Sequence, residues 1–494
     1  MSNKTLTSST VSDTISSPDQ NNIIPSYYIL QRFPTTRFGQ KKNMKHSHVV
    51  FTLLCTFKFG LMASDETDKE KCNDILSLEA QRRVGGAVAK LGLELLENLQ
   101  LGLEQPNIII SPLSVSLALA ELALGANNKT EEKLLEVLQA LPQANFHETL
   151  SCLQEHLTTN AVKMASRLYL LPGFKVNQDF VNRSSRLYKS EPAQLTSIEA
   201  VNHWVEEVTK GHITNFMSSL PSNVVLMLIN AIHFKGEWQS RFDSKFTVKD
   251  FFYIDKKTSV KVDMMMATRY PLSMFVDLKD GTQVARLPFQ GNMSLLVVMP
   301  SHGNLSTTAA KLNISDLYER LPSQKSMHVK LPKFKLESKQ DLRQALTNMG
   351  LGMLFSGPDL SRISEGPLVV SGVQHASSIE LNEQGAEASA ATSVTLVRTI
   401  PTFAVNMPFI FALVDDASYT PLFLGMVTNP NPGATAEQSD EPKTENETVP
   451  SNVRLTDTTL SDGPHENMLS YMLNMWRETV PQQFLGHQEM DQGN

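Results

Sequence analysis

The chain has 494 residues, of which 41% are hydrophobic and 19% charged, a composition typical of globular proteins. Its formal net charge of −7 leaves no basic surplus to neutralise phosphates, so we expect no nucleic-acid and no membrane partner. No run of about 18 uncharged apolar residues predicts a transmembrane helix. The three cysteines form no C-x-x-C pair, and P-loop, zincin and G-x-S-x-G motifs are absent. We therefore predict no metal, no cofactor and no catalytic group.

The first 63 residues form a basic leader with seven Lys or Arg and two Asp. From Met44 the order is basic residues, an apolar stretch from Val49 to Phe57 and a small residue at Ala63, which is the order of a secretory signal peptide. We predict a signal peptide over 44–63; a buried strand is the alternative. Residues 1–43 are predicted to be an upstream extension that need not be translated.

A single large domain is predicted over 64–433, followed by an acidic, largely disordered tail over 434–494. The tail contains 11 acidic residues and three Lys or Arg.

Secretion would remove Cys55 with the signal peptide and leave Cys72 and Cys152, a natural disulfide pair in an oxidising compartment. Two free thiols are the alternative. Secretion also makes the Asn-x-Ser/Thr sites candidates for glycosylation; within the domain they are Asn128, Asn182, Asn292, Asn304 and Asn313.

Helices are expected early in the domain and strands in its second half, which predicts an α+β fold. Ser111 and Pro112 suit the cap and first position of a buried helix that ends at Gly125. The apolar run from Val224 to Phe234 predicts a strand covered on both faces, although it contains Asn230. Further strands are predicted over 294–300, 328–336, 409–414 and 422–427.

The stretch over 382–400 is unusual because a Glu-Gly pair is followed by a run of small residues. Small, partly β-branched residues without Pro can enter a sheet at little steric cost, so this stretch could be either loop or strand. Arg398 is a lone cation among Val, Leu and Thr, and it would suit the primary pocket of a trypsin-like protease. The alternatives are a flexible linker and an ordinary surface charge.

These patterns coincide with a family resemblance. From about Cys72 to Pro432 the chain resembles the serpins, through NIIISPLSVSLALAELALGA, VNHWVEEVTKGHI, LINAIHFKGEWQSRF, VKLPKFKL, ELNEQGAEASAAT and VNMPFIFALVDD with PLFLGMV. The resemblance implies one large domain with a central β-sheet, further sheets, surrounding helices and an exposed reactive-centre loop. It also implies a serine protease inhibitor that acts as a suicide substrate.

The resemblance assigns roles to particular residues. The scissile bond would lie between Arg398 and Thr399; the spacing from Gly385 is one residue shorter than in most serpins. The remaining roles follow from matching motifs. They are the loop hinge (Glu383, Gly385, Glu387, Ala388, Ser389, Ala390 and Ala391), the shutter where the sheet parts (Ser111, Ser114, Asn230 and His375) and the breach above it (Trp238).

Within the family the chain resembles the antiplasmin branch, through the placing of its cysteines and the acidic tail after NPNPGA. This implies a secreted, monomeric inhibitor of trypsin-like proteases such as plasmin and trypsin that regulates fibrinolysis. Docking to fibrin or to plasmin kringles through the termini has little support: SDETDKEKCNDILS at the mature start offers no match to the fibrin-linking glutamine, and the tail has a single lysine, Lys443, for kringle domains. Two alternatives stay open: an inhibitor of complement and contact proteases like the C1-inhibitor branch, and a non-inhibitory carrier.

Overall fold

The fold is α+β, as the order of the sequence patterns predicts, and it is built around two β-sheets. The computed structural model describes residues 72, 75–99, 101, 106–140, 145–158, 161–221, 223–301, 305–385 and 400–438. The predicted upstream extension, the signal peptide and nearly all of the acidic tail lie outside this part of the chain, so these boundaries remain predictions. Within it, no helix combines the length and apolar character that crossing a membrane requires.

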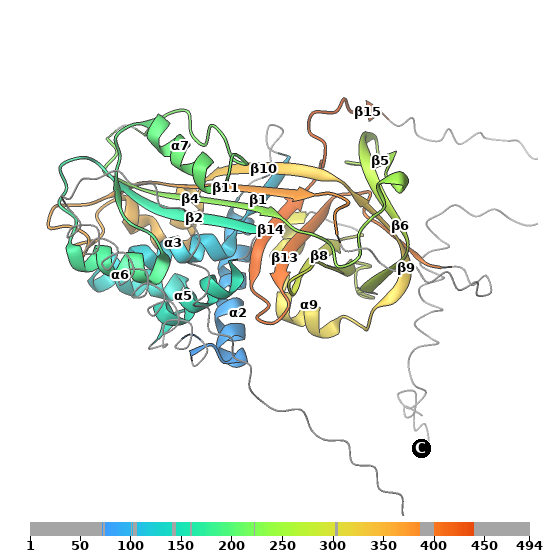
Figure 1. The fold of residues 1–494 in the computed structure, drawn as a ribbon, viewed down its shortest axis with the longest axis horizontal. Coiled ribbons are helices and arrows are strands. Elements are labelled where there is room, and N and C mark those ends of the chain that lie inside the picture. Colours follow the sequence, from blue (N-terminus) through green and yellow to red (C-terminus); the bar gives the residue numbers. More distant parts are fainter. Residues whose placement is uncertain are drawn as a thin grey trace, which may run out of the picture.

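The smaller sheet has five strands in the order β10-β11-β4-β2-β3. Their bounds are β2 Val162–Leu170, β3 Ala193–Gln194, β4 Leu226–Lys235, β10 Phe334–Asp341 and β11 Val370–Leu381. Helix α7 (Ile198–Val208) lies over one face, and helices α3, α5 and α6 gather at the opposite face (Figure 1). Their bounds are α3 Pro112–Gly125, α5 Phe146–Leu157 and α6 Gln178–Tyr188. The middle of the sheet is therefore buried on both sides.

The larger sheet has ten strands, eight of them in the order β1-β14-β13-β8-β7-β6-β9-β12, with β5 and β15 also paired to β6. The bounds are β1 Asn107–Ile110, β5 Val248–Tyr253, β6 Thr258–Val276, β7 Gln283–Pro288, β8 Met293–Met299, β9 Lys325–Pro332, β12 Thr402–Ala404, β13 Phe409–Asp415, β14 Pro421–Val427 and β15 Glu437–Gln438. The other helices are α2 Leu78–Asn98, α4 Asn128–Val137, α8 Leu305–Ala309, α9 Ile314–Arg320 and α10 Arg343–Leu346, with short turns at Ser244–Phe246, Thr347–Leu351 and Gly352–Phe355.

Helix α3 forms where its local signals predict. The Ser111 side chain accepts a hydrogen bond from the backbone N–H of Ser114, and Pro112 occupies the first turn, where no backbone donor is needed. All 14 residues of α3 are buried, because the helix packs between the two sheets and the neighbouring helices. This burial explains its lack of a polar face.

The predicted strand over 224–234 is β4, whose first nine residues are buried. The predictions over 294–300, 409–414 and 422–427 correspond to β8, β13 and β14. The single strand predicted over 328–336 is wrong, because this segment is divided between β9 and β10, which belong to different sheets. The chain passes between the sheets at Lys333, directly after Pro332, where the Lys333 N–H makes the last contact with β6 by donating to the Asp263 carbonyl.

Candidate functional site at a strand seam and its hinge

The site lies where β4 and β11 meet in the centre of the five-stranded sheet, a boundary we call the seam. The two strands run parallel, from Leu226 opposite Val370 to Lys235 opposite Glu380. On the face that carries α7, the Lys235 ammonium and the Glu380 carboxylate are 2.7 Å apart across the seam. A parallel ladder is somewhat less stable per residue than an antiparallel one, so the seam is weaker per residue than the antiparallel ladders on either side of it, β10–β11 and β4–β2.

A buried hydrogen-bond network fastens the seam from the α3 side. The Ser114 hydroxyl donates to Oδ1 of Asn230 at 2.7 Å, and Nδ2 of Asn230 donates to the Ser114 carbonyl at 2.7 Å. On β11, Nδ1 of His375 is 2.8 Å from the same Asn230 oxygen, and the Ser111 N–H donates to Nε2 of His375 at 3.0 Å. The structure thus brings together all four predicted shutter residues, from α3, β4 and β11.

These contacts define the protonation state of His375. Because Nε2 accepts the Ser111 N–H, Nδ1 carries the proton and donates to Asn230. Burial lowers the pKa of His375 to about 3, because an imidazolium would be desolvated there. A second proton would also face the Ser111 N–H. The network therefore requires a neutral histidine.

The hinge begins at the upper end of β11, where residues 382–385 pack on Trp238. The Trp238 N–H donates to the Gln384 carbonyl at 2.9 Å, and its indole N–H donates to the Asn382 carbonyl at 2.6 Å. Gly385 is required here, because a Cβ at this position would lie 2.4 Å from the Trp238 carbonyl oxygen. Trp238 is fully buried and stacks on Phe289 at 4.0 Å. The predicted breach tryptophan thus holds the start of the hinge.

Glu383 ties the hinge to the crossing between the sheets. Its carboxylate is 2.9 Å from the Lys333 ammonium and accepts the Thr247 hydroxyl at 2.8 Å. Burial acts to raise the pKa of Glu383, but the hydrogen bonds from Lys333 and Thr247 outweigh burial and hold the pKa below its usual range. The carboxylate is charged at neutral pH, and these contacts hold residue 383 against the crossing between the sheets.

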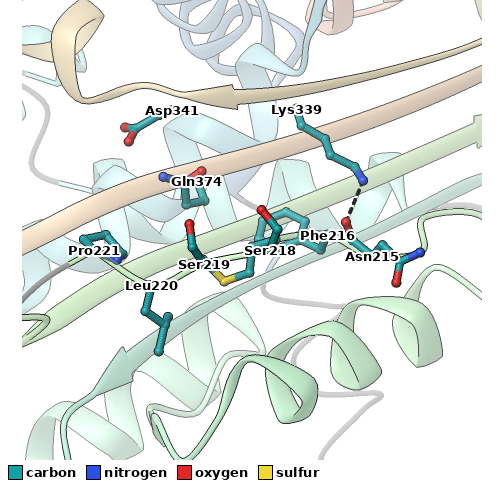
Figure 2. A pocket seen from close by; sticks show the side chains of 10 residues that line it. Asn215, Phe216, Ser218, Ser219, Leu220, Pro221, Lys339, Asp341 and Gln374 are labelled. Carbon is teal, nitrogen blue, oxygen red and sulfur yellow. Dashed lines mark hydrogen bonds between the residues drawn. The ribbon is translucent and has the colours of Figure 1, made fainter.

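The segment between α7 and β4 crosses the outer face of the sheet, and we call residues 209–221 the strap. The Lys339 ammonium on β10 donates to the carbonyls of Thr214 and Asn215 at 3.1 and 2.7 Å. Figure 2 shows this contact beside Gln374, with strap residues lying over β4 and β11. A pocket of about 500 Å³ lies between the strap and the sheet. Any strand that enters the seam must pass under the strap.

Three comparisons with known proteins agree with this architecture. A family model described as "Serpin (serine protease inhibitor)" matches residues 86–430. Alpha-2-antiplasmin of Mus musculus is 41% identical over 395 residues, which cover 78% of this chain and 80% of that protein. Plasma protease C1 inhibitor of Homo sapiens is 29% identical over 376 residues, which cover 73% and 74%. The solved mouse protein-Z dependent protease inhibitor is 29% identical, has a TM-score of 0.65 and covers 72% of this chain and 98% of its own.

The chain belongs to the serpin family.

Several residues predicted to act in this serpin lie outside the described part of the chain. They are the scissile pair Arg398 and Thr399, the hinge residues Glu387, Ala388, Ser389, Ala390 and Ala391, and the sequon at Asn304. Their roles remain predictions. The described ends of the loop are Gly385, after β11, and Ile400, before β12.

The features expected of a secreted serpin have clear positions. Cys72 and Cys152 are joined by a disulfide, with Cα atoms 5.3 Å apart. Four of the predicted glycosylation asparagines have exposed side chains: Asn128, Asn182, Asn292 and Asn313. Asn182 lies on α6, and Asn313 accepts a hydrogen bond at the start of α9.

The sequence analysis missed the residues that act as partners across the seam and hinge. Lys333 holds Glu383 although 50 positions separate them, and Lys339 holds the strap from β10. His233 lies under the strap, with Nδ1 3.2 Å from the Ser378 hydroxyl of β11. The sequence offered one sign of this residue: His233 lies within the apolar run of β4, where a polar side chain needs a hydrogen-bond partner.

Proposed function

We propose that this serpin is a secreted inhibitor of plasmin and related trypsin-like proteases that regulates fibrinolysis. The protease serine attacks the Arg398 carbonyl, the bond to Thr399 breaks, and an acyl-enzyme forms. Before water hydrolyses this ester, the loop enters the seam as a new strand and carries the protease with it. The inhibitor needs no catalytic group of its own.

One observation carries the insertion step: the loop begins at the top of the seam itself. The chain leaves β11 after Leu381, pairs once more with Trp238 at Gly385, and enters β12, in the other sheet, at Thr402. After cleavage the loop is released from β12 and can turn back along β11. A strand that turns back in this way runs antiparallel to β11, and also to β4, since these two are parallel. One parallel ladder is thereby replaced by two antiparallel ladders, which favours insertion. Loop insertion in serpins is a known case of strand addition.

The length of the loop also matches the length of β11, beside which it would insert. Residues 386–397 supply 12 residues and reach about 40 Å when extended, and β11 has 12 residues. The loop residues 388–393 are all Ala, Ser or Thr, which can enter the sheet interior without a large steric or desolvation penalty. This composition opposes the non-inhibitory carrier function, which would allow bulky or charged residues there.

We assign gating roles on the same basis. The network of Ser111, Ser114, Asn230 and His375 is the shutter that must rearrange when the seam parts, and Trp238 closes the breach through which the loop enters. The disulfide and the exposed sequons support secretion and glycosylation.

Plasmin is favoured over complement proteases by the higher identity to alpha-2-antiplasmin than to C1 inhibitor. Arg398 suits both target classes, because its guanidinium can pair with a carboxylate in a trypsin-like primary pocket. Docking of the tail to plasmin kringles has only Lys443 in its support.

The test is to mix the purified protein with plasmin, trypsin and complement proteases and to look for denaturant-resistant complexes at the summed mass. We expect a complex with plasmin that Arg398→Ala reduces at least about 100-fold, since charged hydrogen bonds of roughly 1.5–3 kcal/mol each are lost. Lys443→Ala is the control and should leave the covalent complex intact. An undiminished complex from Arg398→Ala would place the bond elsewhere, and selective trapping of complement proteases would favour the C1-inhibitor alternative.

A further inference from the structure

Two histidines stack where the strap crosses the seam. The rings of His212, in the strap, and His233, on β4, have centroids 3.7 Å apart and planes inclined by 6°. The backbone fixes His212 in this position: its N–H donates to the Thr209 carbonyl, and the Thr209 hydroxyl accepts the next N–H, from Ile213. Ile213 is buried between α7 and the sheet. The backbone and Ile213 therefore hold His212 against His233, and the stacked rings join the strap to the seam.

His233 is buried and has only one hydrogen-bond partner among the described residues. Its Nδ1 is 3.2 Å from the Ser378 hydroxyl across the seam, and its Nε2 is buried without a partner. Burial, together with a smaller effect of the neighbouring His212, lowers the pKa of His233 to about 4. A neutral ring is thus favoured while the strap covers it.

The charges on this face of the sheet act on the His233 ring in opposite directions: Glu380 raises its pKa, and Lys335 and Lys235 lower it. The strand registers place Lys163 of β2 and Glu337 of β10 in the same row as His233 and Ser378, and Lys235, Glu380 and Lys335 in the next row. Both carboxylates already have lysine partners, Glu380 at 2.7 Å from Lys235 and Glu337 at 3.7 Å from Lys335. In these two rows of described residues, each carboxylate is thus already paired with a lysine, so neither is free to pair with an imidazolium at His233.

Proton binding and strap opening are therefore linked. When the strap lifts, water reaches His233 and the ring regains the proton affinity of an exposed histidine, near pH 6.5. A group that binds protons better in the open form shifts the equilibrium toward opening by up to about tenfold per pH unit as the pH falls.

We propose that His212 and His233 form a pH-dependent catch that holds the strap over the seam, and that acidification below about pH 6 releases the strap and eases strand entry between β4 and β11. Release of the strap is independent of the protease target; the effect on strand entry rests on the proposed function. Histidine, alone among side chains with ordinary pKa values, gives such a switch near physiological pH.

The first test measures hydrogen exchange of the backbone amides of residues 209–221 in the full chain at pH 7 and pH 5, corrected for the intrinsic chemical rate. The opening constant of the strap should rise about 20-fold in the wild type. His233→Phe keeps an aromatic ring under His212 but cannot titrate, so its constant should stay unchanged. His212→Ala should raise exchange already at pH 7 and respond weakly to pH.

Lys339→Met is the matched control, because it removes the other strap contact and leaves both histidines in place. Its strap should exchange faster at both pH values, with the wild-type ratio between them. A wild-type strap that exchanges equally at pH 7 and pH 5 would overturn the proposal. So would a His233→Phe strap that keeps the wild-type response.

The second test measures uptake of a synthetic peptide with the sequence of residues 386–397, which would occupy the seam. Wild-type uptake should be faster at pH 5 than at pH 7, and His233→Phe uptake should not be. A strap that responds to pH with no change in uptake rate would support the catch and overturn its link to strand entry. A strap that responds to pH in a protein that takes up no peptide at either pH would support the catch and contradict the proposed function.

Discussion

The shutter histidine makes a quantitative prediction about stability and pH. His375 is neutral and buried in the native protein, with its pKa lowered from 6.5 to about 3. The unfolded chain exposes this imidazole and binds the proton more readily. The contribution of His375 to the free energy of unfolding is therefore fully present above pH 6.5 and is lost as the pH decreases toward 3. Between pH 7 and pH 5 the expected loss from His375 is about 2 kcal/mol.

The perturbation that isolates this residue is His375→Asn, which keeps a donor toward Asn230 and cannot titrate. The variant leaves the Ser111 N–H without its acceptor, so it should be less stable at pH 7 by about 1–3 kcal/mol. Its further loss between pH 7 and pH 5 should be smaller than that of the wild type by about 2 kcal/mol.

The measurement is the free energy of unfolding by urea at both pH values, with the slope checked for each protein. His233 also titrates in this window, but it contributes equally to both proteins and cancels in the difference. Equal pH-dependent losses in wild type and His375→Asn would refute the reasoning, because the buried neutral histidine would then not be responsible for acid sensitivity.

The remaining predictions concern the hinge, the loop and the disulfide. Glu383→Gln should lower the unfolding free energy by about 1–3 kcal/mol, because it breaks the charged contact with Lys333. The control is Glu437→Gln, which breaks an exposed ion pair with Lys261 and should change the unfolding free energy by less than about 1 kcal/mol. Equal effects in urea unfolding would contradict a special role for the hinge pair. Cys152→Ser should destabilise the protein by about 2–5 kcal/mol, measured in the same way against reduced wild type, which should show the same loss. Ala390→Arg should turn the inhibitor into a substrate that is cleaved at Arg398 without a stable complex, since a charge cannot enter the sheet interior cheaply; full trapping of plasmin on a denaturing gel would argue against insertion.

Local signals in the sequence were enough to predict those elements whose structure depends on residues close together in the chain. Ser111 and Pro112 set the start of α3 through capping and a missing donor, both of which depend on residues within one turn. The apolar run of β4 predicted a strand buried on both faces, and Asn230 within it predicted a polar network, since a buried amide needs partners. The family resemblance then placed the other shutter residues.

Only the tertiary structure decided which residues meet across the sheets. Nothing local joins Glu383 to Lys333 or His212 to His233, and the break between β9 and β10 at Lys333 depends on the position of the second sheet. Hydrophobic periodicity reports which face of a strand is buried, but it contains no information on strand order or register, which follow from packing between distant segments. Composition, capping and apolar runs therefore determined the fold class and its main elements, and the three-dimensional packing of the chain determined the contact of Glu383 with Lys333, the course of the strap and the stacking of His212 on His233.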